Sequence, residues 1–167
     1  MTSRNFANQL SGQVGEALGV AELGRMGIVA TAFSGNVPDI DILAYKDGNS
    51  TAVQVKAWKT GSVSFDARRF LHIEFDGHKQ IVTGIHEHIG RLPIYVFVKL
   101  GEDKSSDEFY ILDQLVLAKL VNDGYQAFLD LHNGVRPRNP QTTHNSVTLT
   151  QLAPYKDNWN VLLNELN

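Results

Sequence analysis

The sequence predicts an α/β protein with a central mixed β-sheet flanked by helices. Three observations favour this class: an N-terminal stretch with helical periodicity, a middle third of short apolar runs separated by turn residues, and a last third that is again largely helical. The 167 residues suit one domain over residues 1–167. Within it we expect a core over about residues 3–112 and a helical elaboration over about residues 113–167.

The first expected element is a helix over about residues 3–26. Apolar residues recur in it at spacings of three and four and form one stripe, namely Phe6, Leu10, Val14, Ala17, Leu18 and Ala21. Glycines at 12, 15, 19 and 24 weaken such a helix by about 1 kcal/mol each relative to alanine. A neighbouring backbone packed close to the helix would explain them, and Gly27 is placed to end the helix.

The middle third predicts two hairpins and a further strand pair. An Asp-Gly pair, a strong hairpin signal, stands at residues 47–48 and again at residues 76–77. The expected strands are residues 41–45, 51–57, 70–73, 80–83, 92–100 and 109–112.

The last third is expected to hold helices and one long loop. The expected elements are helices at 115–121 and 125–131 with an interruption at 122–124, a loop at 132–145, a short strand at 147–149 and a helix at about 157–166. The loop region carries His132, Arg136, Arg138 and His144, and a loop of this length could close over a bound anion.

The composition excludes several classes of function. With no cysteine, the chain has no thiolate metal site and no cysteine nucleophile. The longest apolar stretch, residues 92–98, is too short to cross a membrane, so we expect a cytoplasmic protein. The net charge of −3 means that nucleic-acid binding would need a local basic site.

The first hairpin carries the main candidates for chemistry. With a two-residue turn at the Asp-Gly pair, the numbers of opposed residues sum to 95, so Asp41 faces Gln54 and Asp39 faces Lys56. Two carboxylates, a carboxamide and an ammonium group then share one face. A three-residue loop would separate them.

These side chains suit metal-assisted hydrolysis of a phosphodiester. Asp41 and Gln54 offer oxygen ligands of the kind that Mg²⁺ binds, and Lys56 could orient a water or stabilise charge on a phosphate. Glu16 lies on the flank of the helix stripe, turned partly toward whatever the helix packs against. The alternative is a surface hairpin with a solvated ion pair, and a glutamate with no chemical role.

Three segments, taken together, resemble the PD-(D/E)xK phosphodiesterase superfamily, with resolvase-like and Mrr-like members as the nearest comparison. They are Gln13-Val14-Gly15-Glu16, Pro38-Asp39-Ile40-Asp41-Ile42-Leu43 and Gln54-Val55-Lys56, and the likeness covers about residues 10–57. The resemblance implies a restriction-endonuclease-like core formed by the N-terminal helix and the hairpin that follows it.

The resemblance also implies roles for individual residues. Asp41, Gln54 and Glu16 would surround magnesium, with manganese as an alternative, and Lys56 would assist the nucleophilic water. Asp39 would be an auxiliary ligand or a partner of Lys56. Because Gln54 stands where an acidic ligand is usual, the site carries one negative charge fewer.

We therefore expect a magnesium-dependent DNA endonuclease, with Lys59, Arg68 and Arg69 as contacts to DNA phosphates. A homodimer would supply the two sites that cleavage of both strands needs. Two alternatives stay open. One is a catalytically inactive protein of the same fold that binds nucleic acid or a protein partner, and the other is a small-molecule or structural protein on an unrelated α/β fold.

Overall fold

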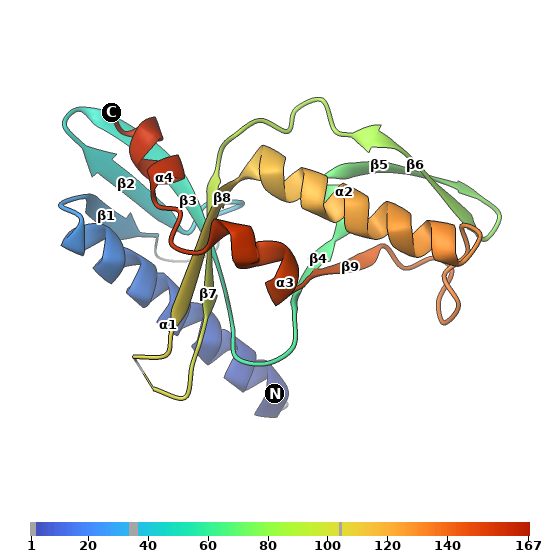
Figure 1. Ribbon diagram of the computed structural model, residues 1–167, viewed down its shortest axis with the longest axis horizontal. Coiled ribbons are helices and arrows are strands. Elements are labelled where there is room, and N and C mark those ends of the chain that lie inside the picture. The colour runs from blue at the N-terminus through green and yellow to red at the C-terminus, as the bar shows by residue number, and fades with distance from the viewer. Residues whose placement is uncertain (1–2, 34–36, 104) are drawn as a thin grey trace.

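A five-stranded mixed sheet forms the centre of the protein, which confirms the predicted α/β class (Figure 1). The computed structural model describes residues 3–33, 37–103 and 105–167, and side chains from Gln9 onward. The strand order is β1-β2-β3-β7-β8, with β3 and β7 parallel and the other neighbours antiparallel. Two further strand pairs, β4–β9 and β5–β6, form separate small sheets.

The elements have the following bounds. The helices are α1 (Ser3–Arg25), α2 (Gln114–Leu131), α3 (Leu149–Leu152) and α4 (Asn160–Glu165), with 3-10 turns η1 (Ala67–Arg69) and η2 (Ala153–Tyr155). The strands are β1 (Val29–Ala32), β2 (Ile42–Lys46), β3 (Asn49–Trp58), β4 (Val63–Asp66), β5 (Leu71–Asp76), β6 (Lys79–Ile85), β7 (Ile94–Lys99), β8 (Glu108–Asp113) and β9 (His144–Val147).

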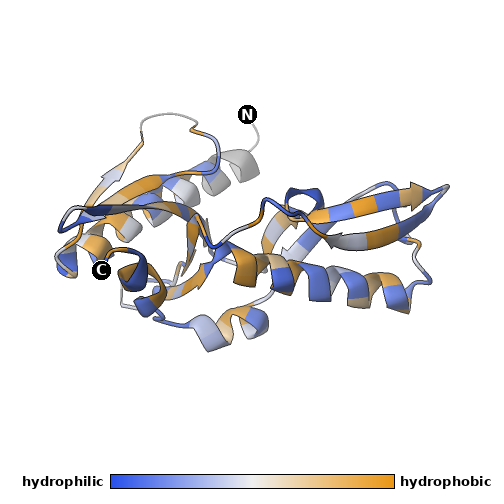
Figure 2. Ribbon diagram, turned by 90° about the horizontal axis from the view of Figure 1, so that it is seen from above, coloured by the Kyte–Doolittle hydropathy of each residue, from blue (hydrophilic) through white to orange (hydrophobic). Residues whose placement is uncertain are grey.

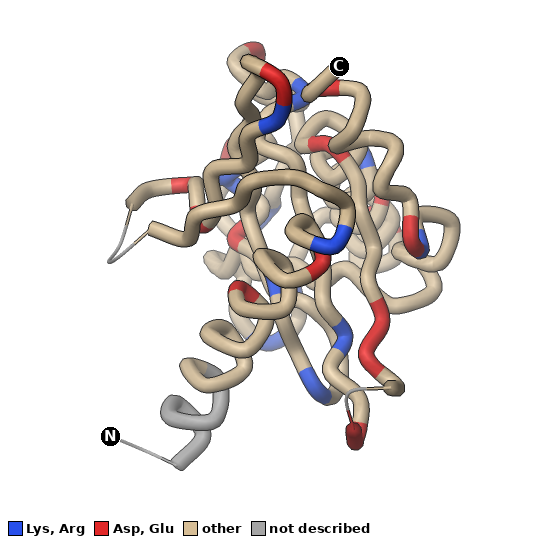
Figure 3. The backbone as a smooth tube through the Cα atoms, turned by 90° about the vertical axis from the view of Figure 1, so that its left-hand side faces the viewer, with Lys and Arg blue, Asp and Glu red and all other residues tan. Residues whose placement is uncertain are grey.

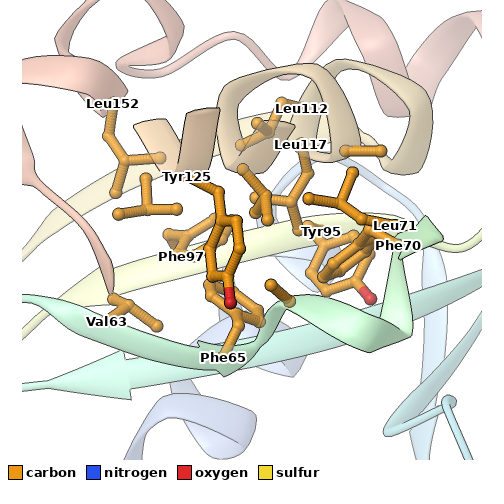
Figure 4. Close-up of a cluster of buried hydrophobic side chains, with 14 of the residues drawn as sticks. Val63, Phe65, Phe70, Leu71, Tyr95, Phe97, Leu112, Leu117, Tyr125 and Leu152 are labelled. Atoms are coloured by element: carbon orange, nitrogen blue, oxygen red, sulfur yellow. The ribbon is translucent and has the colours of Figure 1, made fainter. Parts of the chain in front are cut away.

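The two faces of the central sheet pack into two different apolar clusters. One cluster joins α1 and the C-terminal segment to the sheet, through Leu23, Leu162 and Leu166. The other joins α2 and the small strands to the sheet. In Figure 4, Leu117 and Tyr125 of α2 lie among Phe65, Phe70, Tyr95 and Phe97. Since side chains alternate along a strand, Val53 and Val55 of β3 face α1, while Gln54 and Lys56 point to the opposite face.

Helix α2 and the β5–β6 ribbon together extend away from the central sheet as an arm (Figure 2). The hydropathy colouring shows apolar and polar residues alternating along the ribbon. The arm is anchored in the core, because Leu117, Val121, Tyr125 and Leu129 of α2 are all at most 2% exposed.

The first hairpin has the predicted two-residue turn and the predicted register. Asp47 and Gly48 both have positive φ, 51° and 98°, as a turn of the I′ kind requires. Lys46 pairs with Asn49 and Ile42 pairs with Val53, so opposed residue numbers sum to 95. This register positions the candidate site.

The packing face of α1 differs from the predicted apolar stripe. Leu10 and Val14 are each 44% exposed, whereas Gly15, Gly19 and Leu23 are buried. The reason is steric: β3 approaches so closely that a Cβ atom at Gly15 would lie 2.3 Å from the Cβ atom of Ala57. Gly15, Gly19 and Leu23, and not Leu10 and Val14, therefore face the sheet. The predicted stripe residue Phe6 lies outside the residues with described side chains.

Two predictions for the last third were wrong. Helix α2 runs without a break through residues 122–124, because Val121 and Tyr125 on either side are buried in the same cluster. The expected strand at 147–149 lies earlier, at His144–Val147, and Thr148 begins α3 with a reciprocal capping interaction with Gln151. Among the described residues, no helix combines the length and apolarity needed to span a bilayer.

Candidate active site

Asp41 is held in one position by the hairpin, immediately before β2. Its backbone N–H donates to the carbonyl of Val53 at 2.9 Å, which extends the strand pairing. Its carboxylate Oδ2 accepts a hydrogen bond from the backbone N–H of Val55 at 2.7 Å and another from the side-chain amide of Gln54. Gln54 is only 5% exposed, so both groups are fixed by the sheet.

Lys56 and Glu16 bring two further charges to the same place. Partial burial lowers the pKa of Lys56, and the nearby Arg69 lowers it further, while Asp41, Asp39 and Glu16 oppose this shift. Burial also raises the pKa of Glu16, as does the charge of Asp41, while Lys56 acts in the opposite direction. Glu16, Asp41 and Lys56 are thus close enough for their charges to interact, although they come from α1 and from two different parts of the hairpin.

Asp39 lies at the edge of this group and pairs with Arg69. Its φ of 64° takes the chain out of the extended conformation, so β2 does not continue to a position opposite Lys56. The Asp39 side chain is 62% exposed and accepts a hydrogen bond from the guanidinium of Arg69. The direct partner of Asp39 is therefore Arg69, and its effect on Lys56 is electrostatic.

The three predicted phosphate contacts fall in two places. Arg68 and Arg69 line a hollow of about 450 Å³ beside Asp39, together with His86 and His88. Lys59 follows the end of β3 and pairs with Glu102 at 3.5 Å. No described contact joins Lys59 to Asp41 or Lys56.

Tyr95 and Gln114 also belong to this region, and no sequence motif marks either of them. Tyr95 of β7 pairs with Gln54 across the parallel β3–β7 ladder and is 1% exposed. Burial raises its pKa, and the charges of Arg69 and Asp39 also act on it. Gln114, the first residue of α2, lines the hollow. The strand pattern around Tyr95 shows only that it is apolar, so its position beside Gln54 depends on a long-range pairing.

The donor set fits one divalent cation of the magnesium type. Asp41 offers Oδ1, which takes part in none of the hydrogen bonds of the described residues, and Gln54 and Glu16 offer further oxygen atoms. Magnesium usually takes one or two carboxylates and keeps several waters. Within residues 3–33, 37–103 and 105–167, no three histidine or acidic side chains come together with the geometry of a metal site, so the carboxamide and waters would have to complete the set.

The electrostatic character of the site is local. Figure 3, viewed from the side of α1, β1 and β2, shows acidic and basic residues interspersed along the backbone. Asp41 and Lys56 therefore act at short range, and a broad single-sign field does not surround them.

Comparison with solved structures supports the α/β fold. Neither a known protein family nor a curated protein matches the sequence. Among solved structures, the fold is similar to that of a bacterial homing endonuclease, I-Ssp6803I, with a TM-score of 0.53 and 14% sequence identity. The similarity covers 94% of this chain and 93% of that one, so the whole α/β architecture is shared.

Proposed function

We propose that the protein is a magnesium-dependent DNA endonuclease of the PD-(D/E)xK type, with Asp41, Gln54, Glu16 and Lys56 as its catalytic residues. The observation that carries this proposal is the fixed Asp41–Gln54 pair, with Lys56 two residues along the same strand face. The nuclease-like fold is consistent with it.

Each residue has a distinct task in this proposal. The N–H of Val55 holds the Asp41 carboxylate in place, so a ligand oxygen is already oriented before substrate binds. A bound Mg²⁺ would polarise the phosphate and lower the pKa of the attacking water. The Lys56 ammonium orients that water and stabilises the negative charge that develops on the phosphate. Glu16 adds a second carboxylate from α1.

The test is cleavage of DNA by point variants in the presence of Mg²⁺ or Mn²⁺. Asp41→Asn keeps an acceptor for the N–H of Val55 but removes the charge, and Lys56→Ala removes the cation. We expect either change to reduce cleavage by about 100-fold or more. Matched controls are Glu74→Ala on β5 and Lys119→Ala on α2, which are exposed and line none of the hollows described here. Full activity of either site variant would refute the mechanism.

Metal binding should be measured separately by calorimetry, on the wild type and on Asp41→Asn. Binding that is lost in the variant would assign the metal to this hairpin. Wild-type-like binding by Asp41→Asn would place any metal elsewhere and contradict the ligand set proposed here.

Gln54 favours one second candidate function, a catalytically inactive protein that binds nucleic acid or a protein partner. A neutral residue at this position weakens the case for tight metal binding, and the net charge of −3 offers no broad attraction for DNA. DNA binding without cleavage, and without any metal dependence, would support this alternative. An unrelated small-molecule site predicts Asp41 and Gln54 on opposite faces, and the structure instead joins them by a hydrogen bond.

The homodimer and the cytoplasmic location stay predictions. The structure describes a single chain, and sedimentation of the protein with and without DNA would test the dimer.

A further inference from the structure

Three hollows adjoin one another and lead from the candidate active site to the loop before β9. The first, of about 450 Å³, contains Arg69 and Arg68. The second, of about 300 Å³, shares Arg68 with the first and extends to His144. The third, of about 550 Å³, shares His144 with the second and extends to Arg136 and Arg138. Because each hollow shares lining residues with the next, the three lie in a row, and we refer to this row as the groove.

Hydrogen bonds join the two chain segments that line the middle hollow. The backbone N–H of Ala67 donates to the carbonyl of Thr143 at 2.8 Å, and the Thr143 hydroxyl donates to the Asp66 carboxylate at 2.6 Å. The same carboxylate accepts from the backbone N–H of Arg68 at 3.0 Å. Figure 1 shows β9 running beside β4, so the loop that precedes β9 is held against η1. The distal arginines are therefore positioned relative to the site.

The groove is basic although the chain is acidic overall. Four arginines line it, against two aspartates, and each aspartate already pairs with an arginine of the groove, Asp39 with Arg69 and Asp66 with Arg68. His86, His88 and His144 also line it and would add charge when protonated.

The two distal arginines have no acidic partner among the described residues. Arg138 is exposed and takes part in no ion pair or hydrogen bond found there. The guanidinium of Arg136 lies over two aromatic rings, 4.6 Å from the centroid of Phe128 and 5.2 Å from that of Tyr125. Stacking of this kind fixes the cation without neutralising it.

We propose that this groove binds the phosphate backbone of the DNA strand that enters the active site, with Arg138 and Arg136 as phosphate contacts distant from the scissile bond. The inference rests on the proposed nuclease function. A row of cations along an open groove matches the repeated charge of a polynucleotide, whereas a small anion would occupy only one of the three hollows. The substrate is then an extended DNA strand.

The experiment measures binding of a fluorescently labelled DNA duplex by anisotropy, in EDTA so that no cleavage occurs, at salt concentrations between about 50 and 200 mM. The variants are Arg138→Ala, Arg136→Gln and Arg69→Ala. The matched control is Arg25→Ala on α1, whose side chain is 76% exposed and lines none of the three hollows. Thermal melts confirm that each variant is folded.

We expect Arg138→Ala to weaken DNA binding by about fivefold. The slope of the logarithm of the association constant against the logarithm of the salt concentration should become smaller by about 0.9, which is the change for one lost phosphate contact. Arg25→Ala should bind like the wild type. If Arg69→Ala weakens binding while both distal variants keep wild-type affinity and slope, the groove proposal is overturned and the proposed function stands. If the wild type neither binds nor cleaves DNA, both proposals fail.

Discussion

Helix α1 lies directly against strand β3 at Gly15, and replacing this glycine with alanine should both destabilise the protein and displace Glu16. The new Cβ atom would lie 2.3 Å from the Cβ atom of Ala57 and 3.4 Å from Cγ1 of Val55. Both neighbours belong to a central strand, and the Ala57 Cβ atom is attached directly to its backbone. Neither can move aside as the end of a long side chain would, so the helix itself has to shift.

The distances set the expected size of the effect. Ordinary contact begins at about 3.4 Å, so α1 must move by about 1 Å. Overpacking of this kind costs about 1–3 kcal/mol, and the better helix propensity of alanine offsets about 1 kcal/mol of it. The matched control is Gly12→Ala on the same helix, where nothing lies within 4 Å and only the propensity gain applies. The two variants should therefore differ by about 1–3 kcal/mol in free energy of unfolding.

Urea denaturation of the wild type, Gly12→Ala and Gly15→Ala measures this difference, and DNA cleavage by the same three proteins measures the effect on the site. A displacement of about 1 Å in a positioned catalytic group can reduce the rate by about 100-fold. Equal stabilisation by both substitutions would refute the close approach of α1 and β3. Lower stability of Gly15→Ala with unchanged cleavage would remove Glu16 from the proposed mechanism.

Three further substitutions test the charges of the structure. Glu16→Gln should raise the free energy of unfolding at neutral pH by about 0.5 kcal/mol, because the raised pKa of Glu16 shows that its charge is unfavourable in the folded state. The gain should disappear below pH 4.5, where Glu16 is protonated in both the folded and the unfolded state. Urea titrations at several pH values measure it. Asp66→Asn should lower the free energy of unfolding by about 1 kcal/mol at neutral pH, a value reduced because the Asp66 side chain is 44% exposed. Hydrogen bonds from Arg68 lower the pKa of Asp66 to about 2. The difference in stability from the wild type should therefore fade between about pH 4 and pH 2. Gln54→Glu should lower the free energy of unfolding in EDTA by about 2–4 kcal/mol, because it places a second carboxylate against Asp41. Thermal melts with and without Mg²⁺ should show that the cation restores part of this loss.

The hairpin that positions Asp41, Gln54 and Lys56 was predictable because its determinants are local. A two-residue turn needs positive φ at both positions, and the Asp-Gly pair at residues 47–48 satisfies this. Once the turn is fixed, counting along the two strands determines which residues are opposed. The second Asp-Gly pair also located the β5–β6 ribbon, but its turn lies one residue later, at 77–78, because Asp76 still pairs with Lys79.

The face of α1 and the partner of β3 were not predictable in this way. Periodicity wrongly favoured Leu10 and Val14 as the packing face. The expectation that a neighbouring backbone approaches the helix glycines is confirmed at Gly15 and Gly19, but the sequence did not show that these two define the face. The parallel pairing of β3 with β7 joins segments that are distant in the sequence, and no local signal specifies it. The position of Tyr95 beside Gln54 is therefore visible only in the structure. Arg136 and Arg138 stood out in the sequence as loop residues that could bind an anion, but only the structure shows which hollows they line.

Gln54 determines how the site is stabilised when no cation is bound. Its amide and the N–H of Val55 both donate to Oδ2 of Asp41, so the protein alone holds this oxygen in place. An acidic residue there would place two carboxylates in contact and would need a cation to offset their repulsion. A Mg²⁺ ion bound at the other Asp41 oxygen, Oδ1, would leave this hydrogen bond in place but would meet one negative charge fewer. Under the proposed function, a phosphate oxygen of the substrate supplies the missing anionic ligand, so Mg²⁺ and DNA each raise the affinity for the other by the same factor.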